Sequence, residues 1–234
     1  MPRELRRLAR ARRLRAVRVC GRPAWCGDGL VAVALGVGPA RAGTSASAVL
    51  DEVVPSRVLV TGVAGGIDPR LHVGDVLVPA AVLDLRTGRT FVPPIAAHPS
   101  SRSSGGLLVT VERVVAGGAG AGGLPPGTAA VDMESAAVAA AAEERGIPWD
   151  VVRGISDTEG TLTPEVAGIL RADGSADLRR AAGLVARRPL DAWHLLRLGV
   201  GSARALRAAA AAVEAGLGAW APPEAHRADG HEPG

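Results

Sequence analysis

The stretch that decides the fold is VDMESAAVAAAAEERGIPWDVVRGISD, residues Val131–Asp157. Its alanine-rich first half predicts a helix to about Arg145, because alanine has the highest helix propensity and Gly146 and Pro148 end the helix. A mostly apolar run from Trp149 to Ile155 then predicts a buried strand. A helix that leads directly into a buried strand is typical of an α/β fold.

The end of this strand carries polar groups that favour a ligand site. Arg153 lies among apolar neighbours, and a buried arginine is rarely without a charged partner. Ser156 and Asp157 follow, so a carboxylate emerges at the C-terminal edge of the strand. In open α/β sheets ligands bind at that edge. The alternative for Asp157 is a turn or a helix N-cap, where aspartate is common.

An earlier segment predicts another part of the same edge. Residues 56–61 predict a buried parallel strand, and residues 62–66 predict a glycine loop whose bare backbone lets a ligand approach. Farther along, residues 73–85 predict one strand and residues 87–104 a surface loop rich in Arg, Pro and Ser. Residues 116–127 are a glycine-rich connection.

The composition is that of a globular domain. A chain of 234 residues with 47% hydrophobic residues can bury a sizeable core. We expect one domain over residues 1–220 and a disordered tail over residues 221–234. The net charge of +4 is spread along the chain, and only 2% of the residues are aromatic. No nucleic-acid partner is expected, because basic clusters and stacking platforms are both scarce.

No metal, cofactor or membrane span is expected. Cys20 and Cys26 have no second cysteine pair or histidine cluster near them, which argues against the common zinc patterns. The G-x-G of residues 36–38 lacks the third glycine of a dinucleotide-binding fingerprint. No apolar run reaches the ~20 residues that span a bilayer, and no apolar signal segment follows the arginine-rich start. We expect a cytoplasmic protein.

Four motifs together resemble the nucleoside phosphorylase and nucleosidase superfamily, and in particular its methylthioadenosine/S-adenosylhomocysteine nucleosidases. They are VTGVAGG from Val60, VGDV from Val73, DMESAAVA from Asp132 and VVRGISD from Val151. The resemblance covers residues 1–157 well and the remainder loosely. It implies an α/β fold with three α/β/α layers around a central mixed β-sheet, a small-molecule nucleoside as substrate, and a homodimer.

The resemblance also implies roles for residues in breaking an N-glycosidic bond. Asp157 would protonate the departing purine at N7, for which burial must raise its pKa towards the working pH. Ser156 would contact the edge of the base. Glu134 would hold the ribose hydroxyls, and Met133 would pack against the sugar. Gly62 and Gly65 of the glycine loop would also contact the substrate. A glutamate that serves only the helix dipole and a core methionine are the alternatives for Glu134 and Met133.

The first residues match a further part of the family pattern. Residues 1–5, MPREL, resemble the loop after the family's first strand, whose glutamate activates the attacking water. We predict that Glu4 is this carboxylate, and that Arg153 pairs with Glu4 or with the water between them. We also predict that the chain as given lacks the first strand. The alternative is a basic surface helix or an arm for acidic partners.

The glycine loop favours hydrolysis over phosphorolysis. In the family's phosphorylases this loop carries an arginine and a serine that hold phosphate, and the matching residues here are Val60 and Val63. Two valines cannot pair with a dianion, and burying phosphate unpaired costs on the order of several kcal/mol. Two alternatives remain: a phosphorylase that holds phosphate with Arg41 and Arg153, and a nucleoside-binding protein without activity.

Three stretches, VDMESAAVA, TVERVV and the C-terminal RPL…LLRLG, resemble one subgroup, the hopanoid-associated nucleosidases that remove adenine from adenosylhopane. This likeness implies a substrate with a large apolar 5′ substituent. A predicted helix over residues 191–217 has an apolar face that suits such a group, with Trp193, Leu196, Val200, Ala203 and Leu206. Core packing is the alternative for this face, and peripheral contact with a membrane surface is another.

Overall fold

The computed structural model describes residues 9–10, 12–36, 38–94, 103–112, 123–158 and 189–217, with the backbone alone for residues 103–104 and 189–198. At its centre lies an eight-stranded mixed β-sheet in the order β7-β6-β9-β10-β4-β11-β5-β8. Its two longest strands, β4 (Val58–Gly66) and β11 (Trp149–Asp157), are parallel neighbours. The others are β5 (Val76–Val78), β6 (Ala81–Asp84), β7 (Thr90–Phe91), β8 (Ser103–Ser104), β9 (Leu107–Thr110) and β10 (Thr128–Asp132).

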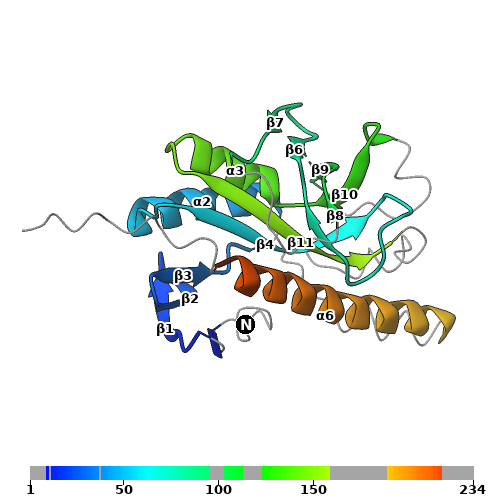
Figure 1. Cartoon of the computed structure of the whole chain (residues 1–234), viewed down its shortest axis with the longest axis horizontal. Helices are drawn as coiled ribbons and strands as arrows, with labels where there is room; N and C mark the ends of the chain where they lie inside the picture. Colours follow the sequence, from blue (N-terminus) through cyan, green and yellow to red (C-terminus); the bar gives the residue numbers. More distant parts are fainter. Residues whose placement is uncertain are drawn as a thin grey trace, which may run out of the picture.

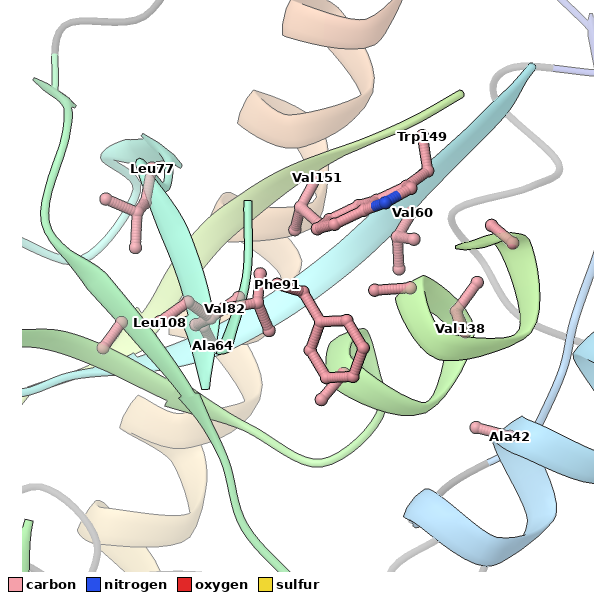
Figure 2. Packing of buried hydrophobic residues seen from close by; sticks show 14 of the residues in the cluster. Ala42, Val60, Ala64, Leu77, Val82, Phe91, Leu108, Val138, Trp149 and Val151 are labelled. Atoms are coloured by element: carbon pink, nitrogen blue, oxygen red, sulfur yellow. The ribbon is translucent and has the colours of Figure 1, made fainter. Parts of the chain in front are cut away.

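Helices cover both faces of this sheet (Figure 1). α2 (Pro39–Val53) and α3 (Ser135–Glu143) pack on one face, and α6 (Pro189–Leu217) lies along the other. The larger core cluster lies under α2 and α3, where Figure 2 shows Val60 of β4 and Val151 of β11 beside α3. The predicted α/β/α layers around a mixed sheet are therefore confirmed.

A second, smaller sheet lies beside α6 (Figure 1). Its strands β1 (Arg15–Val19), β2 (Arg22–Gly27) and β3 (Leu30–Val33) form an antiparallel meander. Nη2 of Arg12, just before β1, donates a hydrogen bond to the carbonyl of Glu214 in α6 at 3.4 Å. This contact ties the small sheet to the helix that covers the main one.

Several expected boundaries were wrong. Residues 62–66 belong to β4 and not to a loop, because the strand continues through its glycines in register with β11. Residues 73–85 hold two short strands, β5 and β6, instead of one. The V-G-D turn before β5 is pinned to β11, since N of Gly74 donates to the carbonyl of Ile155 at 2.8 Å. The segment expected as a surface loop contributes β7 and β8, and the sequence does not predict β10.

The face of α6 that packs on the sheet consists of small residues, contrary to the prediction of a face with large ones. Its buried residues are Gly201, Ala205, Ala209, Ala212, Val213 and Gly216. Val200 is 58% exposed, Ala203 is exposed and Leu206 is only half-buried. Trp193 and Leu196 lie outside the described side chains.

The buried face of α6 consists of small residues because the backbones of α6 and β11 are in contact. A Cβ added to Gly154 of β11 would collide with the carbonyl of Ala205. Likewise, a Cβ added to Gly201 of α6 would collide with the carbonyl of Ser156. Large side chains between the two elements would prevent this approach, so Gly and Ala occupy the contact.

Two further findings concern the described ranges only. No helix in them is long and apolar enough to cross a membrane. No group of three or more His, Cys, Asp or Glu side chains in them could hold a metal ion. Cys20 and Cys26 are free thiols. The expected tail, residues 221–234, lies outside the described part of the chain.

Candidate active site

The candidate site lies where β4 and β11 end side by side. In their parallel register Arg153 is opposite Gly62, and Asp157 is opposite Gly65. A Cβ on Gly62 would collide with Nη1 of Arg153, and one on Gly65 would lie 3.3 Å from Oδ2 of Asp157. The two glycines therefore leave room for charged side chains of β11. Their predicted contact with a substrate stays a prediction.

Arg153 is held by a buried ion pair with Asp132. The Arg153 side chain is 4% exposed and that of Asp132 is 0% exposed. Nη2 of Arg153 donates to Oδ2 of Asp132 at 2.5 Å and to Oγ of Ser135 at 3.0 Å, and Nε donates to the same Oγ at 3.2 Å. The sequence predicts Glu4, or the water between the two residues, as the partner. Glu4 lies outside the described residues, and within them Asp132 takes that place.

Both carboxylate oxygens of Asp132 are occupied. Oδ1 accepts a hydrogen bond from Oγ1 of Thr110 at 2.6 Å, and Oδ2 accepts one from N of Ser135 at 2.9 Å besides that from Arg153. Oγ1 of Thr110 in turn accepts from N of Ala136 at 3.0 Å. The carboxylate thus ties the ends of β9 and β10 to the first turn of α3, where the helix dipole favours a negative charge.

Glu134 directly precedes α3 and faces Arg153. Its Oε2 lies 3.7 Å from Nη2 of Arg153, and its Oε1 accepts a hydrogen bond from N of Gly38 at 3.0 Å. Burial raises the pKa of the Glu134 carboxyl above its ordinary value; the charge of Arg153 opposes this rise, and that of Asp132 adds to it. When ionised, this carboxylate can accept hydrogen bonds from hydroxyl groups.

Asp157 ends β11 as a half-buried carboxyl. Burial raises the pKa of Asp157 above its ordinary value, and the hydrogen bond from Oγ of Ser156 to Oδ1, at 2.5 Å, partly offsets the rise. A carboxyl that keeps its proton towards neutral pH can act as a general acid. Oγ of Ser156 also lies 3.3 Å from the carbonyl of Ala64, and its predicted contact with a base stays a prediction.

The predicted site residues fall into two groups. Arg153 and Glu134 share one charged network, and Ser156 and Asp157 pair at the end of the same strand. Met133 is partly buried and packs against a cluster of the buried valines Val109, Val111 and Val131. Its packing against a ribose stays a prediction.

Three residues of the network were missed from the sequence: Asp132, Thr110 and Ser135. The role of Asp132 could have been predicted from the sequence, because Asp132 belongs to the same motif as Glu134 and a buried arginine requires an acidic partner. Nothing in the sequence indicates the role of Thr110. It precedes Asp132 by 22 residues, and only the parallel pairing of β9 with β10 brings the two together.

The sequence matches the model of the phosphorylase superfamily over residues 21–106 and 106–187. Two sequence relatives are 5'-methylthioadenosine/S-adenosylhomocysteine nucleosidases. That of Tolumonas auensis is 26% identical over 166 residues, which cover 59% of this chain and 72% of the relative. That of Marinomonas sp. is 29% identical over 167 residues, with coverage of 59% and 72%.

Solved structures show the same architecture. The 5'-methylthioadenosine/S-adenosylhomocysteine nucleosidase from Neisseria meningitidis, in complex with methylthio-immucillin-A, superposes with a TM-score of 0.68. It is 21% identical, and the match covers 94% of this chain and 96% of that one. The futalosine hydrolase of Helicobacter pylori gives a TM-score of 0.66 at 17% identity, with 94% of each chain covered. At these identities the likeness is one of fold.

Proposed function

The chain belongs to the phosphorylase superfamily, and from this premise we propose that it is a nucleosidase, an N-glycosidase that hydrolyses a purine nucleoside and releases adenine. The observation that carries the proposal is the Asp157 carboxyl, whose pKa is raised by burial at the C-terminal end of β11. The sequence relatives, which are nucleosidases, support the same reaction class.

Cleavage requires a proton on the departing base. As the C1′–N9 bond breaks, its electron pair stays with the purine, and Asp157 donates its proton to N7. This role requires a carboxyl that remains protonated at the working pH, which is the form that burial favours. A well-placed general acid contributes roughly 100- to 10,000-fold to the rate.

The sugar gains positive charge as the bond breaks. We assign Glu134 to the ribose hydroxyls, because its ionised carboxylate accepts hydrogen bonds and lies next to the fixed charge of Arg153. Met133 packs against the sugar in this proposal. A preorganised anion near an oxocarbenium-like sugar stabilises the transition state more than the ground state.

Water is the proposed nucleophile. Val60 is 7% exposed and Val63 is half-buried, so the two residues at the phosphate-binding positions of the family's phosphorylases bring no charge. Arg153 is already paired with Asp132, and Arg41 is exposed. A phosphate dianion would find little compensation here. Water adds to C1′ and loses one proton, which we assign to the carboxylate of Glu4.

The first substrates to test are adenine nucleosides with a 5′ thioether, because the names of the relatives specify them. A large apolar 5′ substituent, as in adenosylhopane, and a role in hopanoid biosynthesis are finer proposals. The role in hopanoid biosynthesis rests on the sequence resemblance. The apolar substituent is supported by Val200, which is 58% exposed and adjoins Gly201 at its contact with the Ser156 carbonyl. The proposed homodimer rests on the sequence resemblance. The proposed cytoplasmic location rests on the cysteine pattern and the lack of a long apolar run in the sequence, and peripheral membrane contact rests on the helix predicted over residues 191–217.

Replacing the acid tests the proposal directly. Asp157→Asn keeps the shape of the side chain and removes the transferable proton, so adenine release from methylthioadenosine should fall by about 100-fold or more. Chromatography of released adenine measures this loss. Asp28→Asn is the matched control, because Asp28 is exposed in the turn between β2 and β3 and asparagine tolerates its positive φ of 49°. Equal rates for both variants would refute the role of Asp157.

Two other functions have distinct outcomes. A phosphorylase would produce ribose-1-phosphate derivatives and would require added phosphate. A nucleoside-binding protein would bind methylthio-immucillin-A without turning over any of the three substrates, methylthioadenosine, S-adenosylhomocysteine and an adenosylhopane analogue. The same assay, run with and without phosphate, separates both from the proposed hydrolase.

A further inference from the structure

We infer that Asp132 is a positioning residue, which fixes the guanidinium of Arg153 and, through it, the carboxylate of Glu134. The inference rests on the proposed function, in which Glu134 holds the ribose. Asp132 belongs to the DMESAAVA motif, but the motif by itself assigns it no role.

The geometry excludes direct contact between Asp132 and a substrate. Its side chain is 0% exposed, and both oxygens accept hydrogen bonds from the protein. The donors lie on three different elements, since Thr110 ends β9, Ser135 begins α3 and Arg153 lies on β11. Asp132 can therefore act on the reaction only through these neighbours.

One atom links Asp132 to the ribose-binding carboxylate. Nη2 of Arg153 donates to Oδ2 of Asp132 and also lies 3.7 Å from Oε2 of Glu134. On the other side, Nη1 of Arg153 lies so close to Gly62 that a Cβ there would collide with it. The guanidinium is confined between β4 and β10. Any shift relative to Asp132 changes its distance to Glu134, and a misplacement of ~1 Å can cost about 100-fold in rate.

A substitution of Thr110 can change the position of Asp132 without altering any group that contacts Arg153. Its hydroxyl donates to Oδ1 of Asp132 and accepts from N of Ala136, so it is one step removed from Arg153. Thr110→Val keeps the size of the side chain and leaves Oδ1 without that donor. The carboxylate should then turn towards its remaining donors and draw Nη2 of Arg153 away from Glu134.

The test compares Thr110→Val with wild type in kcat, KM and the pH profile for methylthioadenosine. We expect kcat to fall about 10- to 100-fold with KM changed less than about 3-fold. The acid limb should move to higher pH, because Glu134 loses the positive charge that opposes the rise of its pKa. Thr110→Ser restores the hydroxyl and should rescue most of kcat. Thr90→Val, at an exposed threonine of β7, controls for the Thr-to-Val change in a strand.

A crystal structure of Thr110→Val completes the test. The inference predicts that Nη2 of Arg153 is displaced relative to Glu134. An unmoved Arg153, or an unchanged kcat and acid limb, would overturn it. If wild type releases no adenine, the proposed function fails, and the position of Arg153 in the variant still decides the inference. Should Thr110→Val not fold, Thr110→Ala removes the same donor to Oδ1 of Asp132 with a smaller side chain and is judged by the same readouts.

Discussion

Burial raises the pKa of both Asp157 and Glu134, but the groups next to the two carboxyls differ. The only side-chain partner that lowers the pKa of Asp157 in the described structure is the neutral hydroxyl of Ser156. Glu134 instead lies 3.7 Å from the cation of Arg153 and accepts a backbone hydrogen bond from Gly38. A cation stabilises an ionised carboxylate more than a neutral hydroxyl does. This difference suits Asp157 to donate a proton and Glu134 to accept hydrogen bonds.

The pH dependence of kcat follows from Asp157. The acid must be protonated, so kcat should fall as pH rises through its raised pKa. Oγ of Ser156 donates to the ionised carboxylate and lowers this pKa. Ser156→Ala should therefore raise the pKa further and move the alkaline limb of kcat to higher pH. A pH–rate profile measures the shift, and Ser47→Ala on α2 is the control. A limb that stays in place or moves to lower pH would contradict the assignment.

The pairing of residues in the site could be predicted only in part. The motif with Glu134 and the strand that ends in Asp157 are local in sequence, so spacing alone indicates both. The Arg153 ion pair depends on three strands meeting, which no local pattern contains. The contact of Gly62 and Gly65 with a substrate stays a prediction, and the structure shows that the two glycines also make room for Arg153 and Asp157 of β11. Glycine shows where space is needed, but not what fills it.

At the scale of elements, the contact of α6 with β11 holds the second layer of the fold. Alanines and glycines of α6 lie against the strand, and Gly154 and Gly201 bring the two backbones together. Amphipathic patterning misses such a face, because Ala and Gly carry little weight as apolar signals. By contrast, α3 and β11 were predicted correctly, since an alanine run and a Gly-Ile-Pro break are strong local signals.

Two glycines of α6 give a matched pair of variants. Gly201→Ala should lower Tm by about 2–8 °C, because the added methyl overpacks the contact with Ser156. Gly199→Ala should raise Tm by roughly 2–4 °C, because nothing lies within 4 Å of its Cβ position and alanine favours the helix. Differential scanning calorimetry measures both. Equal shifts in the same direction would show that α6 does not pack on β11 in this way.

At the scale of the whole molecule, the sheet gathers the chemistry at one place. β9, β10, β4 and β11 are consecutive in the sheet, and their ends carry the Asp132 network and the Asp157 carboxyl. α3 begins next to Asp132 and adds Ser135 and the positive end of its dipole. The layers on either side keep these strand ends fixed, which a reaction that depends on the placement of two carboxyls requires.

The central claim is that the nucleophile is water and not phosphate. Analysis of the reaction products distinguishes the two. Wild-type protein is incubated with methylthioadenosine in phosphate-free buffer and in phosphate buffer, and both adenine and the sugar product are quantified. We predict equal rates of adenine release and, in both buffers, a free 5-methylthioribose. A sugar phosphate that forms only with added phosphate, at a rate that rises with its concentration, would contradict hydrolysis.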